Sequence, residues 1–182
     1  FRQDLPEPNL TFNVGLIGGG QSAEIDKDGV RIAVTGMTNI IPPIAVAKGD
    51  FRTLSEDQTR RVQAKMQQIV EQDHLPGTSA TIAFDLGYPS MAPTPGNRAL
   101  LTRLNAVNRD LGLPEMPALD PLKRGAGDIA FVAQDVDGLV GLGPASTGDH
   151  SPAERVDLAS MKRQAKRAAI LMSRLSTEKG GA

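Results

Sequence analysis

The chain has 182 residues, enough to bury one large hydrophobic core or two small ones, and 40% of them are hydrophobic. Lysine and arginine total 20 against 21 aspartate and glutamate, a net charge of -1, so no global field attracts nucleic acid or an anionic membrane. The lack of cysteine excludes disulfides, thiolate metal sites and cysteine nucleophiles, and the lack of tryptophan further disfavours nucleic acid as a partner.

The sequence predicts a soluble protein and leaves its compartment open, cytoplasmic or periplasmic. No apolar run approaches the roughly 20 residues that span a bilayer, and a protein without cysteine suits either compartment. The opening FRQDLPEPNL has neither an initiator methionine nor the regions of a signal peptide. We therefore expect this start to be a cut within a longer protein.

The first half of the chain is predicted to contain strands around one helix. Alternating apolar side chains favour strands at 10–19, 30–36, 44–52 and 78–87, with a loop or hairpin at 18–29. No Lys-Ser or Lys-Thr follows the run Gly18, Gly19 and Gly20, as a phosphate loop would require. A flexible turn is therefore favoured over a phosphate loop. A helix is predicted over 55–73, capped by Ser55, with an apolar stripe of Val62, Met66, Ile69 and Val70. This order indicates a two-layer α+β sandwich with a mostly antiparallel sheet.

The second half begins after the proline-rich segment 88–97, which predicts a boundary between a domain at 1–93 and one at 94–182. A helix is predicted over 97–111, a helix or turn at 125–134 and a short buried strand at 137–144. A final helix is predicted over 157–176, with a packing stripe of Leu158, Met161, Ala165, Ala168, Ala169, Met172 and Leu175.

The chain has two histidines, and their contexts differ. His74 follows acidic residues at the end of a predicted helix, which favours an ordinary surface role. His150 lies in a small-residue loop between the predicted strand at 137–144 and the final helix, a position where ligands often bind. Ser151 and Glu154 also fit a capping box, so a plain helix entry is the structural alternative. One histidine alone cannot make a zinc site, which needs three or four ligands.

Other candidates for contact with an anion are individually weak. Gly127 and Asp128 precede a predicted helical run, where backbone amides can face a carboxylate, although Asp128 serves equally well as a helix cap. Arg52 ends a predicted strand and could bind a carboxylate in a bidentate manner, or could be an ordinary ion-paired residue. Asn39 adds an amide near another strand end.

Three segments in this order carry a resemblance: TNIIPPIAVAKGDFR (38–52), KRGAGDIAFVA (123–133) and GLGPASTGDHSPAERVDLASM (141–161). Over about 10–175 the chain resembles the second half of the zinc-dependent carboxypeptidase and aminoacylase family, and its glutamate carboxypeptidase members in particular. The resemblance implies an α/β fold with an α+β insert. A ferredoxin-like lid, which is also the dimerisation domain, would be followed by the C-terminal part of an α/β zinc-peptidase catalytic domain.

The same resemblance assigns roles to particular residues. His150 matches the family's last zinc ligand, in an enzyme that would hold two zinc ions. Asn39 and Arg52 match lid residues that hold the substrate's carboxylate, for which a planar guanidinium is suited. Gly127 and Asp128 match a Gly-Gly-Thr-Asp segment that lines the substrate site, but Ala126 and Gly127 stand where that segment has Gly and Thr. The implied reaction is cleavage of an amide bond next to a free carboxylate of a peptide or N-acyl amino acid.

The family's other zinc ligands, its general base and its lid histidine all belong to motifs that this sequence does not contain. The resemblance therefore assigns no catalytic residue to this chain, and we expect the 182 residues alone to be inactive. The open edge of a lid sheet predicts a homodimer in the intact enzyme. Two alternatives are a non-catalytic dimerisation or ligand-binding module derived from the family, and an unrelated α+β sandwich.

Overall fold

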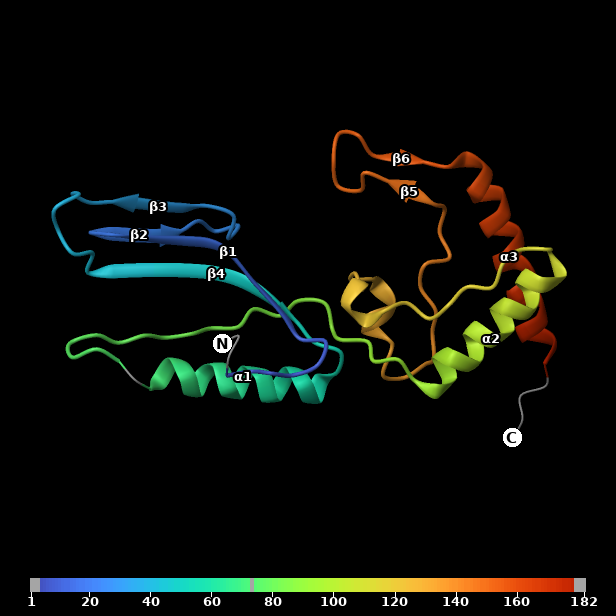
Figure 1. The fold of residues 1–182 in the computed structure, drawn as a ribbon, viewed down its shortest axis with the longest axis horizontal. Coiled ribbons are helices and arrows are strands. Elements are labelled where there is room, and N and C mark those ends of the chain that lie inside the picture. The colour runs from blue at the N-terminus through green and yellow to red at the C-terminus, as the bar shows by residue number, and fades with distance from the viewer. Residues whose placement is uncertain (1–3, 73, 179–182) are drawn as a thin grey trace. The chain divides into compact units, whose positions relative to one another are not determined.

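The structure is a computed structural model that describes residues 4–72 and 74–178. The chain divides into two compact units, Phe1–Ser90 (unit 1) and Met91–Ala182 (unit 2) (Figure 1). Both helices and antiparallel strand pairs are present, so the α+β organisation predicted for the chain is confirmed.

Unit 1 is built from two antiparallel strand pairs, of which one is a hairpin, and one helix. β1 (Thr11–Gly20) pairs with β4 (Ile44–Arg52), and β2 (Ser22–Ile25) pairs with β3 (Ile32–Thr35). The hairpin alternative for the loop after β1 is thus confirmed. Figure 1 shows the β2–β3 hairpin lying along the β1–β4 pair, with α1 (Glu56–Glu71) on the other side.

The glycines at the end of β1 have a packing role, because β3 approaches them closely. A Cβ on Gly18 would lie 2.8 Å from Ile32 Cγ2, and a Cβ on Gly20 would lie 2.2 Å from the carbonyl oxygen of Thr35. Gly20 is buried and both glycines belong to β1. The predicted flexible turn is therefore wrong for Gly18 to Gly20, which form a strand end where another backbone passes.

We expect Gly20→Ala to lower the free energy of unfolding by about 1–2 kcal/mol, because the new methyl group would force β1 and β3 apart. Urea denaturation followed by circular dichroism measures the loss. Gly15→Ala is the control, since the nearest atom to a Cβ there is 3.7 Å away, in the flexible side chain of Asn13. Equal effects of the two substitutions would contradict the close approach at Gly20.

The core of unit 1 lies between α1 and the β1–β4 pair. The Ser55 side chain accepts a hydrogen bond from the Gln58 amide, which confirms Ser55 as the N-cap of α1. Val62 and Met66 face inwards at 0% and 4% exposure and form a buried cluster with Leu5. The half-buried side chains packed against this cluster are Leu10, Phe12, Phe51, Ile82 and Phe84.

The strand predicted at 78–87 is absent from the described residues. The predicted alternation of inward and outward side chains is partly right, since Ile82 and Phe84 pack on the core. The ring of Phe84 meets that of Phe51 edge to face, with 6.1 Å between the ring centroids. Within the described chain, however, no hydrogen bond reaches the backbone of 79–87. The segment is extended but belongs to no sheet, because a strand also needs a neighbour to complete its ladder.

Unit 2 contains α2 (Pro95–Asp110) and α3 (Leu158–Thr177), with short elements between them. These are two turns of 3-10 helix, η1 (Pro121–Lys123) and η2 (Asp128–Phe131), and the pair β5 (Ser146–Thr147) and β6 (Arg155–Val156). The buried strand predicted at 137–144 is wrong, because this segment forms no ladder and only Leu139 and Leu142 pack inwards.

The packing stripe predicted for α3 is mostly wrong, although its last member, Leu175, does pack against the core of unit 2. Leu158 and Met172 are 70% and 63% exposed, whereas the buried positions of α3 are Ser160, Arg167 and Leu171. Leu171 joins Leu104 and Val107 of α2 in the core of unit 2. The inward face is therefore polar at its N-terminal end and apolar only at its C-terminal end.

The polar half of that face holds neighbouring loops in place. The Ser160 hydroxyl accepts a hydrogen bond from the Ala145 amide at 2.8 Å and donates one to the Asp157 carbonyl. The Gln164 amide nitrogen donates to the Gly143 carbonyl at 2.8 Å. In the part of the chain that the structure describes, no helix has the length and apolar character needed to cross a membrane.

Candidate functional site

His150 lies at the exposed tip of a hairpin in unit 2. β5 and β6 pair through Ser146 with Val156 and Thr147 with Arg155, and the loop between them carries the histidine. The Asp157 amide donates to the Ala145 carbonyl at 2.9 Å and closes the base of this hairpin. The histidine is therefore presented by a short, hydrogen-bonded loop.

The backbone of His150 adopts a left-handed conformation, with φ 62. Such a conformation costs a non-glycine residue ~1–3 kcal/mol and persists only where its surroundings impose it. Here the Glu154 carboxylate accepts from the His150 amide at 3.3 Å, and the Ser151 hydroxyl donates to the Gly148 carbonyl at 2.6 Å. Gly148, with φ 70, turns the chain into the loop.

The structure corrects the predicted position of His150 relative to the final helix. α3 begins at Leu158 with Asp157 as its N-cap, so His150 is not at the entry of that helix. Ser151 and Glu154 do not form a capping box. They stabilise the hairpin loop that carries His150, and sequence reasoning assigned them to the wrong element.

The donor set around His150 is too small to hold zinc. A structural zinc site takes four ligands from the protein, and a catalytic zinc site takes three. Among residues 4–72 and 74–178, no group of three or more histidine, cysteine, aspartate or glutamate side chains could hold a metal ion. The residues that the structure describes therefore do not form a complete metal centre.

Asn39 and Arg52 both belong to unit 1, at opposite ends of β4. Asn39 is exposed in the turn before β4 begins at Ile44, and Arg52 is its last residue. Eight residue steps of a strand extend roughly 26 Å. Figure 1 shows the loop before β4 and the end of β4 far apart. Asn39 and Arg52 of the same chain therefore cannot contact one carboxylate.

The Arg52 side chain is partly engaged. Its Nε donates to the Asp50 carboxylate at 3.2 Å, and the side chain is 58% exposed. Within the described residues, its two terminal guanidinium nitrogens make no hydrogen bond. Arg52 can thus offer a pair of donors to an external carboxylate.

Gly127 and Asp128 belong to unit 2, at the start of η2. Gly127 has extended backbone, and its carbonyl accepts from the Ala130 amide at 2.9 Å. Asp128 is exposed and is the first residue of the turn. Because η2 has only 4 residues, it supplies little of the dipole that a longer helix offers an anion.

These observations define an α+β protein of two compact units, each with its own apolar core and one of them presenting a histidine on a strained loop. The chain belongs to the family described as Peptidase family M20/M25/M40, whose model matches residues 5–174. This is a family of metal-dependent amidohydrolases, in agreement with the resemblance carried by 38–52, 123–133 and 141–161.

A curated relative is a succinyl-diaminopimelate desuccinylase of Variovorax paradoxus (strain S110), 27% identical over 132 residues. The similarity covers 71% of this chain and 32% of the relative, so the chain spans about a third of the length of the curated relative it matches. No solved structure matches the chain.

Proposed function

We propose that this chain acts as part of a zinc-dependent carboxypeptidase or amidohydrolase that cleaves an amide bond next to a free carboxylate. Family membership supports the reaction class. The relative is by its name a desuccinylase, which favours an N-acyl amino acid among the candidate substrates, with a small peptide as the other. In this proposal the chain contributes one metal ligand and carboxylate-binding residues, but no catalytic acid or base.

His150 carries the proposal, because its geometry is unfavourable without a function. An exposed side chain on a left-handed backbone gains no packing that would offset its cost. The hairpin and the contacts of Ser151 and Glu154 hold that backbone in place. Rigid presentation of one imidazole to a metal bound by other ligands accounts for this arrangement.

We expect His150→Ala in the full-length protein to reduce zinc affinity more than tenfold and to abolish hydrolysis of an N-succinyl amino acid at limiting zinc. Zinc content by inductively coupled plasma mass spectrometry and activity on the same samples measure both effects. His74→Ala is the control, since His74 is exposed in unit 1 after α1. Full zinc content and activity in His150→Ala would refute the role of His150. The 182 residues alone are expected to show no activity.

The carboxylate of the substrate is assigned to Arg52 first, with Asn39 as a further contact. Because Asn39 and Arg52 lie at opposite ends of β4, a carboxylate held by both would need Asn39 from a second copy of the chain. This geometry supports a homodimer through unit 1.

An open strand edge supports the same homodimer. In the described residues β4 forms a ladder with β1 alone, and a strand edge without a ladder is a common place for two chains to pair. We expect light scattering of the full-length protein to give twice the mass of one chain, and a monomer at micromolar concentration would contradict the dimer.

A non-catalytic dimerisation or ligand-binding module is the second candidate. It is favoured by one observation, that the described residues contain no group of three metal-ligating side chains. The His150→Ala experiment separates the two, because the module predicts neither bound zinc nor activity in the wild-type protein.

A further inference from the structure

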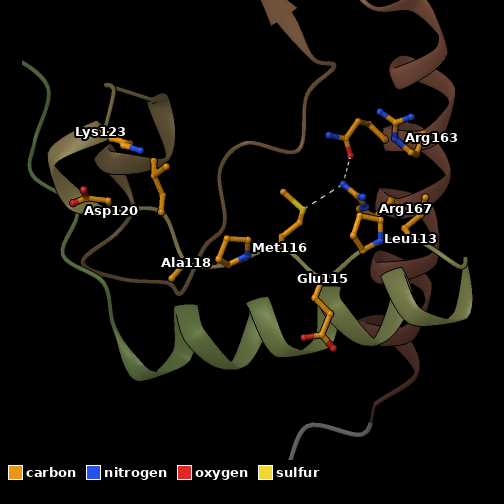
Figure 2. Close-up of a pocket in the computed structure, with 12 residues that line it drawn as sticks. Leu113, Glu115, Met116, Ala118, Asp120, Lys123, Arg163 and Arg167 are labelled. Carbon is orange, nitrogen blue, oxygen red and sulfur yellow. Dashed lines mark hydrogen bonds between the residues drawn. The ribbon is translucent and has the colours of Figure 1, made fainter.

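A pocket in unit 2 is lined by none of the residues that the sequence predicted to be functional. It is an open pocket of about 810 Å³ between the connector 113–120, Lys123 of η1, and α3. Figure 2 shows Arg163 and Arg167 reaching from α3 on one side and Lys123 on the other. The connector supplies a mostly apolar wall of leucine, proline, methionine and alanine side chains.

The connector is held firmly enough to form a lasting wall. The Asn105 side chain of α2 binds both backbone groups of Met116, donating to its carbonyl at 2.9 Å and accepting from its amide at 2.8 Å. The Leu113 amide donates to the Asn108 carbonyl at 2.8 Å. The pocket therefore has a hydrogen-bonded connector on one side and the helix α3 on the other.

Arg167 is a buried cation in this pocket with no acidic partner among the described residues. Its side chain is 6% exposed. One terminal nitrogen donates to the Gln164 side-chain oxygen at 2.5 Å and to the Met116 sulfur at 3.4 Å, which are both uncharged groups. Its Nε, also buried, has no hydrogen-bond partner.

Such surroundings are unfavourable for a charged guanidinium. A buried guanidinium is normally paired with a carboxylate or phosphate, because its desolvation is otherwise uncompensated. Burial, and secondly the charge of Arg163, lower the pKa of Arg167. Both causes disfavour the charged form, and an anion bound beside the two arginines would relieve both.

The two acidic side chains that line the pocket are engaged elsewhere. Glu115 forms an ion pair with Arg109 of α2, and Figure 2 shows its carboxylate pointing away from Arg163 and Arg167. Asp120 caps η1, accepting a hydrogen bond from the Leu122 amide at 3.0 Å. Neither acid neutralises the arginines, so the positive charge of Arg163 and Arg167 is available to an anion from outside the chain.

We propose that this pocket binds an oxyanion, a carboxylate or phosphate, attached to a small apolar group. Arg167 and Arg163 contact the oxyanion, Lys123 contributes attraction from the opposite side, and the connector packs against the apolar part. A planar guanidinium matches the two oxygens of either anion. This site is independent of the proposed function, because it uses neither His150 nor any residue assigned to the substrate carboxylate.

The test is a titration of the ¹⁵N-labelled protein with four probes: phenyl phosphate, benzoate, inorganic phosphate and neutral phenol. We expect phenyl phosphate or benzoate, or both, to shift the amide signals of 113–120 with a millimolar or lower Kd. Which of the two binds more tightly distinguishes phosphate from carboxylate. Inorganic phosphate is expected to bind at least tenfold more weakly than phenyl phosphate, because it cannot use the apolar wall.

Three variants separate this site from non-specific binding. Arg167→Met removes the buried charge but keeps the side-chain bulk, and it is expected to weaken binding at least tenfold. Arg163→Gln changes an exposed residue, leaves the fold intact and is expected to weaken binding about threefold or more. Lys166→Gln, an equal charge change on an exposed position of α3 outside the pocket, is the control and is expected to change nothing.

The proposal is overturned if neither charged aromatic probe binds, or if phenol binds as tightly as benzoate and phenyl phosphate. It is also overturned if Arg163→Gln binds the probes as well as the wild-type protein does. Loss of zinc binding in His150→Ala has no bearing on these outcomes, so failure of the proposed function and failure of this site are distinguishable.

Discussion

Replacing Leu171 with alanine is expected to lower the free energy of unfolding by about 3 kcal/mol, the middle of the range for removing a buried leucine side chain. Leu171 is 6% exposed and packs with Leu104 and Val107 where α3 meets α2. The cavity left behind would lie between two helices, which can close it only partly. Urea denaturation followed by circular dichroism at the helical wavelength measures the change.

The matched control is the next residue, Met172. It is 63% exposed, so Met172→Ala is expected to change stability by less than about 0.5 kcal/mol. The pair tests which face of α3 is buried, since the apolar stripe in the sequence includes Met172 and omits Leu171. A larger loss in Met172→Ala than in Leu171→Ala would mean that α3 packs through the stripe and not as the structure shows.

Replacing Gln58 with alanine is expected to cost about 2–3 kcal/mol, a large effect for a polar residue. The Gln58 side chain is 5% exposed, and two of its hydrogen bonds are made to backbone groups. Its oxygen accepts from the Leu54 amide at 2.8 Å, and its nitrogen donates to the Pro8 carbonyl at 3.0 Å. The substitution leaves both backbone groups without their partners and frees the segment around Pro8 from α1.

Gln68 on the same helix provides the comparison. It is exposed and accepts a hydrogen bond from Lys65 at 3.1 Å, so Gln68→Ala is expected to be nearly neutral. If Gln58→Ala were as mild as Gln68→Ala, the segment around Pro8 would not depend on α1 for its position.

Local signals predicted the helices well. Ser55 is the N-cap of α1 as predicted, and each predicted helix ends within two residues of the observed one. The N-cap of α3, Asp157, was not predicted. Capping depends on a side chain and the backbone of its own turn, so the sequence contains what is needed. β4 was predicted with its observed bounds for a similar reason, because large and small side chains alternate over 44–49.

The sequence could not show which face of α3 is buried. The buried face has Ser160, Gln164 and Arg167 at its N-terminal end, where backbone groups of loops need hydrogen-bond partners. A periodicity argument counts apolar side chains and therefore selects a neighbouring face that is mostly exposed. The loops that Ser160 and Gln164 hold come from elsewhere in the chain, so no window around α3 reveals them.

The candidate site was predictable in part. His150 could be selected from its loop and from the family resemblance, but its left-handed backbone and the contacts of Ser151 and Glu154 depend on the β5–β6 hairpin. That hairpin has only two residues in each strand, too few for a pattern of alternation. The buried charge of Arg167 was equally hidden, because arginine on a helix is ordinarily a surface residue.

The extended segment 79–87 differs from the rest of unit 1 in how it resists opening. Ile82 and Phe84 anchor it through their side chains, and within the described chain no hydrogen bond reaches its backbone amides. Amide protons without a protein acceptor exchange with deuterated solvent at nearly the rate of an unfolded peptide, whatever the global stability. The segment therefore combines a position fixed by its side chains with almost no protection of its backbone amides against solvent exchange.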